Sequence, residues 1–369
     1  MKKKTFIIAE AGVNHNGSLD LAKKMVDAAV ESGADAIKFQ TFSADQLVTK
    51  TVHKAKYQLI ATNAKESQYE MLKKLELSKE DHLVIYHYCS KRNIQFLSTP
   101  FDQESAYFLI NTLDLPVIKI SSGEIMTAPL LLQIAKSGHH TILSTGMATL
   151  GDIEIALGVL AFGYLNDKYK KPSIQTFLQA YCSDEGQKVL KEKVTLLHCT
   201  SEYPADFANI NLSVIDTLKL AFHLPVGYSD HSTGIAVPIA AVAKGAVLIE
   251  KHFTLKRDMI GPDHQASLEP DELKSMITAI REVELALGNN HKKPTSSELS
   301  MQEIARKSLV ALHPIQKGDL FSEKNLGVKR AGCGISPVHY WKLLQQPANF
   351  NYEKDDLINE QLTLDKILY

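Results

Sequence analysis

The hydrophobic residues of the chain fall into eight short runs, and each run ends in a small group of polar residues. Stretches with the apolar spacing of amphipathic helices lie between the runs. A strand followed by a helix, repeated eight times, is typical of a (β/α)8 TIM barrel, an α/β fold with a closed parallel sheet. The predicted strands are Phe6–Gly12, Asp35–Thr41, Gln95–Pro100, Val117–Gly123, Thr141–Met147, Val194–Thr200, Leu224–His231 and Ala246–Phe253.

Helix-start and helix-stop residues support this alternation. Ser18 is suited to cap the predicted helix Ser18–Gly33, and the glycine is suited to end it. The last predicted barrel helix, Glu269–Leu287, begins with the acidic and proline residues that favour a helix N-terminus. The other predicted helices are Lys79–Asn93, Gln103–Leu113, Ala128–Ser137, Asp152–Phe162, Leu212–Phe222 and Ile235–Lys244.

Two predicted connections are unusually long. Ser43–Glu66 follows the second strand, and we expect it to lie over the barrel mouth like a lid. Gly163–Lys193 precedes the sixth strand, at the other end of the barrel. We interpret it as a structural addition with a helical stretch around Phe177–Leu190.

A domain boundary is predicted just after the last barrel helix. Residues 289–300 are polar, contain a proline and have no apolar period, as linkers do. We predict a barrel domain at residues 1–288, a linker at 289–300 and a second domain at 301–369. Short elements in the second domain favour a compact α+β module, whose small core suits docking on another surface.

Composition and charge narrow the class of protein. The 369 residues carry 41 basic and 42 acidic side chains, a balance that favours neither nucleic acid nor a membrane surface as a partner. The apolar run after the lysine-rich start is interrupted at Glu10, so we interpret it as a strand and not as a signal peptide. No apolar run is long enough to cross a bilayer. The four cysteines show no pairing pattern, which favours a reducing, cytoplasmic location.

Two histidines, His231 and His252, end the seventh and eighth predicted strands. Neighbouring strands lie about 5 Å apart, so both imidazoles could reach one divalent ion that acts as a Lewis acid. The alternative is a pair of hydrogen-bonded histidines without a metal.

Two lysines, Lys38 and Lys119, end the second and fourth predicted strands and should point toward the barrel mouth. Two buried ammonium groups are costly unless an anion neutralises them, so we predict a cradle for a phosphate and a carboxylate. Lys119 could instead form a Schiff base with a carbonyl substrate. The hydroxyl groups expected in the cradle are those of Thr99, Ser122, Ser144 and Ser229.

Four acids lie at the same end of the predicted barrel: Glu10, Glu124, Glu250 and Asp263. We expect the lysines and a metal to keep most of them ionised. A carboxylate here could transfer a proton during the reaction, or it could only orient a neighbouring side chain.

Nine motifs at these positions resemble the N-acetylneuraminate (sialic acid) synthase family, which includes the legionaminate and pseudaminate synthases. The segment from Arg306 to Arg330 resembles the antifreeze-like (SAF) domain of that family. The nine motifs are Ile8–Gly17, Ile37–Thr41, Leu97–Asp102, Lys119–Glu124, Leu143–Met147, His198–Pro204, Gly227–His231, Glu250–Thr254 and Gly261–His264.

The resemblance implies a reaction and its requirements. Phosphoenolpyruvate would condense with an N-acylated mannosamine-type sugar, N-acetylmannosamine or 2,4-diacetamido-2,4,6-trideoxymannose, to give a nonulosonic acid and phosphate. The family uses Mn²⁺ or another divalent cation such as Mg²⁺ or Co²⁺. It also forms a head-to-tail, domain-swapped homodimer.

The resemblance also implies residue roles. His231 and His252 would bind the metal, and Arg330 would reach the partner's site and bind the acetamido group of the sugar. Glu124 would lie by the carbon that water attacks. The catalytic residues expected are Glu10, Glu124, Asp263 and Tyr203. The substrate-binding residues expected are Lys38, Gln40, Thr99, Lys119, Ser122, Ser144, Ser201, Ser229, Glu250 and Arg330.

Two positions depart from the family pattern. Some members carry asparagine where Ser201 stands. The loop that usually reads Arg-Pro-Gly-Asn-Gly reads Arg-Ala-Gly-Cys-Gly from Arg330. Without the proline this loop is less rigid, which weakens the expected preorganisation of the arginine.

Two other functions remain open from the sequence. One is a pyruvate-dependent aldolase that uses Lys119 as a Schiff base. The other is a non-catalytic sugar-binding protein with the second domain as its binding module.

Overall fold

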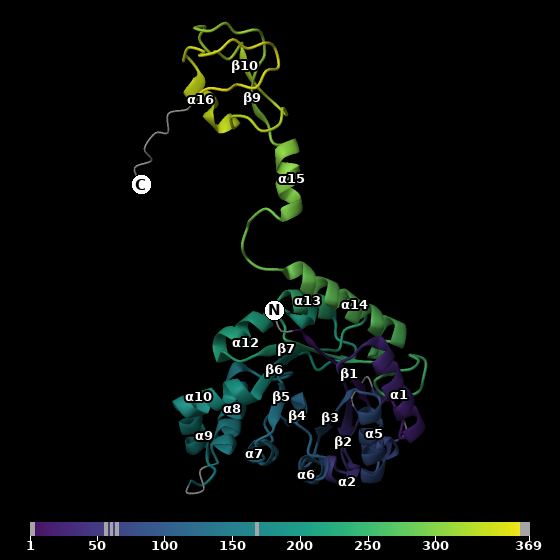
Figure 1. The fold of residues 1–369 in the computed structure, drawn as a ribbon. Helices are drawn as coiled ribbons and strands as arrows, with labels where there is room; N and C mark the ends of the chain where they lie inside the picture. The colour runs from purple at the N-terminus through teal and green to yellow at the C-terminus, as the bar shows by residue number, and fades with distance from the viewer. Residues whose placement is uncertain (1–3, 55–57, 60–61, 63–65, 167–169, 362–369) are drawn as a thin grey trace. The chain divides into compact units, whose positions relative to one another are not determined.

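The computed structural model describes residues 4–54, 58–59, 62, 66–166 and 170–361. The chain divides into two compact units, Met1–Gly288 and Asn289–Tyr369. The first unit holds an eight-stranded parallel sheet, in which the strands run through the middle and the helices surround them (Figure 1).

The eight strands follow one another around a closed sheet. Their order is β3-β2-β1-β8-β7-β6-β5-β4, and the two strands at the ends of this order, β3 and β4, also contact each other. This arrangement confirms the predicted barrel. The strands are β1 (Phe6–Gly12), β2 (Ala36–Thr41), β3 (Gln95–Pro100), β4 (Val117–Ile120), β5 (His140–Ser144), β6 (Val194–Cys199), β7 (Val226–Asp230) and β8 (Leu248–His252).

Helices alternate with the strands as the sequence predicts. Ser18 accepts a hydrogen bond from the Leu21 amide and caps α1, and Gly33 ends it in a left-handed conformation with φ of 84°. The helices of this unit are α1 (Leu19–Ser32), α2 (Ala44–Leu47), α4 (Gln68–Leu75), α5 (Lys79–Lys91), α6 (Gln103–Asn111), α7 (Ala128–Lys136), α8 (Leu150–Leu165), α9 (Ile174–Tyr181), α10 (Asp184–Lys193), α11 (Phe207–Ile210), α12 (Val214–Phe222), α13 (Ala236–Ala243) and α14 (Pro270–Leu287).

Several predicted boundaries differ from the structure, and two of the differences have a clear local cause. β4 ends at Ile120 because a 3₁₀ turn, Ser122–Glu124, replaces the last residues of the predicted strand. The stretch predicted as helical around Phe177–Leu190 is two helices, α9 and α10. Ser183 separates them because its side chain accepts a hydrogen bond from the Gly186 amide and caps α10.

An apolar layer fills the barrel interior just below the polar strand ends. Its buried members are Ile8, Ala36, Leu97, Ile142, Leu197 and Leu248. Each lies two residues before a side chain at the C-terminal end of its strand, and residues two apart face the same side of a strand. The layer therefore supports the next layer of inward-facing side chains, which is polar. A larger apolar cluster packs the strands against the surrounding helices.

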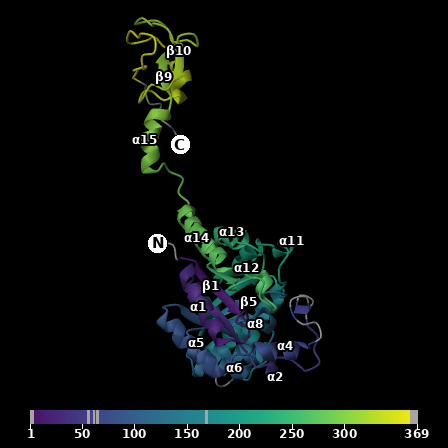
Figure 2. The same ribbon diagram turned by 90° about the vertical axis from the view of Figure 1, so that its right-hand side faces the viewer.

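The connection after β2 contributes α2, and it is followed by α4, which contacts α2 (Figure 2). Among the described residues, no helix combines the length and the hydropathy that a membrane crossing needs.

The second unit begins with α15 (Ser296–Ala305), followed by β9 (Ser308–Ala311), β10 (Leu326–Lys329) and α16 (Tyr340–Leu343). The helix starts inside the segment expected to be a linker, because Thr295 and Glu298 form a capping box. β9 and β10 are antiparallel, with Leu309 opposite Val328. A small apolar core, which includes Phe321 and Tyr352, packs on them.

Candidate active site

The C-terminal ends of the barrel strands surround a cavity of about 360 Å³. This cavity brings together the predicted site residues of the first unit: Glu10, Lys38, Gln40, Thr99, Lys119, Ser122, Glu124, Ser144, Ser201, Tyr203, Ser229, His231, Glu250, His252 and Asp263. Their convergence follows from the fold, because every parallel strand of a barrel ends at the same rim.

Four buried charged side chains alternate in sign at the floor of the cavity. Lys38 Nζ lies 2.7 Å from Glu10 Oε2 and 3.6 Å from Glu250 Oε2. Lys119 Nζ lies 3.6 Å from Glu250 Oε1. The lysines were expected to be neutralised by a bound anion, whereas two carboxylates of the protein share this role in the structure.

Burial and pairing shift the pKa values of these groups. Burial raises the pKa of Glu10 to about 7, although Lys38 partly opposes the shift. Burial also tends to raise the pKa of Glu250, but the two lysines outweigh it and the value is lowered. Asp263 is buried, and burial raises its pKa to about 6. Near neutral pH Asp263 therefore stays mostly ionised, whereas Glu10 takes up a proton more readily than an ordinary carboxylate.

Burial and pairing also shift the pKa values of the two lysines, in opposite directions. Burial alone would lower the pKa of Lys38, but Glu10 and Glu250 outweigh it and raise the value. Burial lowers the pKa of Lys119, and its more distant carboxylate does not compensate. Lys38 is therefore a fixed cation, whereas Lys119 keeps its proton less tightly.

The two predicted metal ligands lie beside each other. The ring centroids of His231 and His252 are 5.5 Å apart. The ring of Tyr203 lies 4.0 Å from that of His231 and 5.7 Å from that of His252, measured between centroids. Nδ1 of His231 lies 2.6 Å from the Thr200 carbonyl oxygen, so the ring can donate there and offer Nε2 to a ligand.

The imidazole of His252 suits a divalent cation, whereas the pKa of His231 is raised because Cys199 and the Thr200 carbonyl oxygen outweigh the effect of burial. Burial, followed by the neighbouring cations, lowers the pKa of His252 well below its ordinary value, so that its imidazole is neutral. Nδ1 of His252 is buried without a hydrogen-bond partner among the described residues. Within the described ranges, no group of three or more His, Cys, Asp or Glu side chains is arranged to hold a metal. The protein would thus supply two ligands and leave the remaining positions to substrate or water.

Hydroxyl groups line the cavity next to the lysines. Lys38 Nζ donates to Thr99 Oγ1 at 3.0 Å, and Ser229 Oγ donates to Glu250 Oε1 at 3.0 Å. Two further hydroxyl groups, those of Ser121 and Ser144, are buried without a partner in the described part of the chain. A buried donor without a partner costs free energy, so both are suited to an incoming acceptor. Ser121 lies within the predicted strand Val117–Gly123 but is not among the substrate-binding residues that the sequence predicts.

Gly146 allows the loop after β5 to approach this cluster. Its amide donates to Ser122 Oγ at 3.0 Å. A Cβ atom at this position would overlap Ser201 Oγ and lie 2.8 Å from Ser122 Oγ. The missing side chain therefore leaves room for two of the hydroxyl groups that line the cavity.

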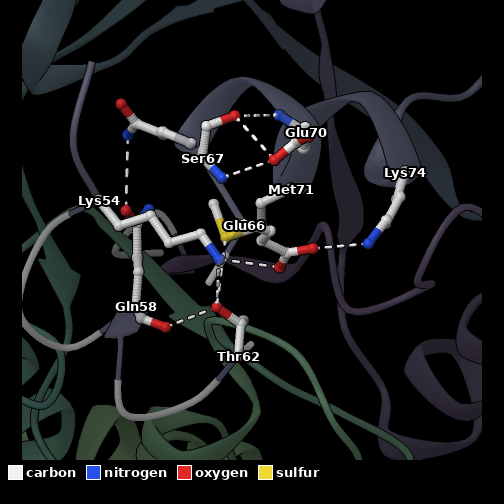
Figure 3. Close-up of polar contacts among 9 residues, drawn as sticks. Lys54, Gln58, Thr62, Glu66, Ser67, Glu70, Met71 and Lys74 are labelled. Carbon is white, nitrogen blue, oxygen red and sulfur yellow. Dashed lines mark hydrogen bonds and ion pairs between the residues drawn. The ribbon is translucent and has the colours of Figure 1, made fainter. Parts of the chain in front are cut away.

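One wall of the cavity comes from the connection after β2 and from α4, as the lid prediction suggested. Gln58 and Gln68 line this wall, and neither is among the site residues that the sequence predicts. Two ion pairs hold this segment together (Figure 3). Lys54 Nζ lies 2.8 Å from Glu66 Oε1, and Lys74 Nζ lies 2.6 Å from Glu66 Oε2. The other members of this wall are Phe42, Leu47, Val48, Met71, Leu72 and Leu75.

Arg330 is the one predicted site residue outside the first unit. It directly follows β10 and is exposed. Its role toward the barrel stays a prediction.

Comparison with known proteins gives one consistent family. Residues 25–292 match the sequence model of the NeuB family. An N,N'-diacetyllegionaminic acid synthase from Campylobacter jejuni is 49% identical over 358 residues, which are 97% of this chain and 100% of that protein. A protein of the same name from Legionella pneumophila is 46% identical over 90% of this chain and 87% of its own length.

A solved structure gives the same result. The N-acetylneuraminic acid (sialic acid) synthetase from Leptospira borgpetersenii, crystallised in complex with citrate, is 34% identical. It superimposes with a TM-score of 0.65 and covers 82% of this chain and 91% of its own.

Proposed function

The chain belongs to the NeuB family, and we propose that it condenses phosphoenolpyruvate with an N-acylated mannosamine-type sugar to give a nonulosonic acid and phosphate. The observation that carries this proposal is the meeting of two buried lysines and two neighbouring imidazoles in one cavity. The lysines suit an anionic reactant, and the imidazoles suit a cation that activates a carbonyl group.

Phosphoenolpyruvate fits the floor of the cavity. Its phosphate and carboxylate would be held by Lys38 and Lys119, with hydroxyl donors around them. The buried hydroxyl groups of Ser121 and Ser144 support this placement because they have no hydrogen-bond partner in the described structure. The remaining donors in the proposal are Thr99, Ser122, Ser201 and Ser229.

The proposed reaction forms one carbon–carbon bond and breaks one carbon–oxygen bond. The C3 atom of phosphoenolpyruvate attacks the aldehyde carbon of the open-chain sugar, and the aldehyde oxygen becomes a hydroxyl group. Water adds at C2, and the resulting intermediate loses phosphate as the C2–O bond breaks. Fixing both reactants in line contributes a large part of the rate, since effective molarities can reach about 10⁵–10⁸ M.

The acids would handle the protons of this reaction. Glu10, with a pKa raised by burial to about 7, can hold or release a proton near neutral pH. Glu124 would lie by the carbon that water attacks, and Glu250 would keep the two lysines in place. In this proposal the sugar hydroxyl groups contact Gln40, Tyr203 and Asp263.

We also propose a divalent cation, Mn²⁺ or a similar ion, at His231 and His252. When bound, it supplies Lewis-acid polarisation of the aldehyde oxygen. Nδ1 of His252, which is buried without a partner in the described part of the chain, and the close approach of the two rings support this assignment.

The second unit has a proposed role as well. We assign it to the antifreeze-like (SAF) class and place Arg330 of one protomer in the site of its partner, in a domain-swapped homodimer. The arginine would bind the acetamido group of the sugar. The four cysteines are free, which supports a cytoplasmic location.

Phosphate release tests the proposed function. The purified protein with Mn²⁺ and phosphoenolpyruvate should release phosphate only when a suitable sugar is present. The sugars to compare are N-acetylmannosamine, its 6-phosphate and 2,4-diacetamido-2,4,6-trideoxymannose. Absence of phosphate with all three sugars would contradict the proposal.

The lowered pKa of Lys119, caused by burial, keeps the aldolase alternative open, since a Schiff-base lysine reacts in its neutral form. Borohydride in the presence of pyruvate distinguishes the two mechanisms. The aldolase would be trapped as a covalent adduct at this lysine, whereas the synthase would not react.

A further inference from the structure

The cavity wall from Phe42 to Leu75 differs chemically from the cavity floor. Its described lining residues are apolar except for Gln58 and Gln68, and none of them carries a charge. The floor, in contrast, holds two lysines and two carboxylates. One cavity therefore offers an ionic end and a neutral wall.

The two glutamines of this wall are close neighbours. Gln68 Nε2 lies 3.5 Å from Gln58 Oε1, and Gln58 is only 8% exposed. A carboxamide both donates and accepts hydrogen bonds, so this pair can match the N–H and the C=O of another amide. The leucine, valine and methionine side chains beside it suit methyl groups.

A buried lysine holds this wall in place and does not serve as an anion site. The side chain of Lys54 is 1% exposed, and its Nζ donates to Thr62 Oγ1 at 2.9 Å and to Glu66 Oε1 at 2.8 Å (Figure 3). Thr62 in turn donates to the Gln58 carbonyl oxygen at 2.6 Å. The charge of the lysine is thus used inside the segment, and its contacts fix the backbone that carries Gln58.

The reaction places one end of the sugar at the floor. The aldehyde carbon must meet phosphoenolpyruvate near Lys38, Lys119 and the two histidines. The opposite end of a six-carbon chain lies several bonds away, so it contacts another part of the cavity. The neutral wall is suited to that end.

We propose that this wall is a subsite for the far end of the acceptor sugar, and that it selects a second acylamino group and a methyl group over a phosphate. Gln58 and Gln68 bind the second acylamino group, while Val48, Leu72 and their neighbours contact the methyl groups. The inference rests on the proposed function. It makes these two glutamines specificity-determining residues and makes 2,4-diacetamido-2,4,6-trideoxymannose the preferred acceptor.

Substrate discrimination in single variants tests the subsite. Gln58→Met and Gln68→Met keep side-chain length but remove the carboxamide. We expect each to lower kcat/KM for the diacetamido sugar by about tenfold, the effect of one lost hydrogen bond. For N-acetylmannosamine kcat/KM should change by less than about threefold, as should the KM for phosphoenolpyruvate, since neither uses the second amide. The wild-type protein should release phosphate more slowly with N-acetylmannosamine 6-phosphate than with either neutral sugar.

Lys73→Met is the matched control, because Lys73 lies on the same helix and does not line the cavity. It should leave the ratio between the two sugars unchanged. Phosphate release that falls equally for both sugars in the glutamine variants would overturn the subsite alone. A preference of the wild type for the 6-phosphate would overturn it too. Absence of phosphate release by the wild type with every sugar would overturn the proposed function itself.

Discussion

Lys251 and Asp230 form an ion pair of 2.7 Å in which both side chains are fully buried. They lie opposite each other in the register of β7 and β8. Each immediately precedes one of the two histidines of the cavity, and successive residues of a strand face opposite sides. The pair therefore lies on the outer side of the sheet and joins the two strand ends that carry His231 and His252.

The carboxylate of this pair has further partners. Asp230 Oδ1 accepts hydrogen bonds from the Tyr228 hydroxyl group and the Ser232 amide, each at 2.9 Å. The ammonium of Lys251 also donates to the Ser232 carbonyl oxygen. Both charged groups thus have hydrogen-bond partners besides each other, which helps a buried ion pair to be tolerated.

Lys251→Met should destabilise the protein strongly. It would leave the Asp230 carboxylate buried without its counter-charge, which costs about 3–5 kcal/mol of unfolding free energy. Urea unfolding followed by circular dichroism measures this loss. The double variant Lys251→Met/Asp230→Leu should recover part of it, because no charge then stays buried. A loss below about 1 kcal/mol in the single variant would show that the pair does not stabilise the strand ends.

Asp263→Asn should change the pH dependence of stability. Burial raises the pKa of Asp263 to about 6 in the folded protein, from an ordinary value of 3.8. Its protonated form is therefore favoured by folding. The contribution of Asp263 to the free energy of unfolding is therefore largest below about pH 4. It falls as the pH rises through 6, by about 3 kcal/mol in total.

The asparagine cannot ionise, so Asp263→Asn should gain stability relative to the wild type between pH 4 and pH 7. Unfolding in urea at a series of pH values, without metal or substrate, checks the sign. A difference that stays constant over this range would contradict the raised pKa.

Gly146→Ala should weaken binding of phosphoenolpyruvate. The added Cβ would overlap Ser201 Oγ and crowd Ser122 Oγ, so both hydroxyl groups must move. We expect the KM for phosphoenolpyruvate to rise about tenfold or more, the effect of displacing hydrogen-bond donors from an anion. Gly151→Ala is a suitable control, because its nearest neighbour would be Thr149 Oγ1 at 3.7 Å. An unchanged KM in Gly146→Ala would exclude these hydroxyl groups from the anion site.

His231→Ala should abolish both Mn²⁺ binding and turnover, because the proposed site then retains one imidazole. Titration calorimetry with Mn²⁺ measures binding independently of activity. His139→Ala serves as a control, since His139 precedes β5 at the opposite end of the barrel. Turnover by the wild type in a metal-free preparation would contradict the role of the cation.

The sequence predicts the barrel well because its signals are local. Short apolar runs and period-3.6 patterns, together with caps such as Ser18 and Gly33, indicate strand and helix positions without reference to the rest of the chain. The strand-end residues could be predicted for the same reason, since the fold sends all of them to one rim. The helical stretch predicted around Phe177–Leu190 is divided in the structure, because the Ser183 side chain caps a second helix.

The missed features depend on contacts between distant segments. Gln58 and Gln68 lie in a long connection and on α4, where no periodic pattern marks a residue as facing a cavity. The buried carboxylates that neutralise Lys38 and Lys119 come from β1 and β8, so their pairing follows only from the closed sheet. The raised pKa of Glu10 likewise depends on burial, which composition does not reveal.

The apolar layer beneath the strand ends determines from which side reactants can reach the cavity. The barrel interior below the polar strand ends is filled by apolar side chains, among them Ile8, Leu97 and Leu197. Among the described residues this layer closes the lower end of the cavity, so molecules would enter from the side of the strand ends. In the proposed reaction phosphoenolpyruvate would therefore bind on the floor before the sugar covers it, and phosphate would leave after the product.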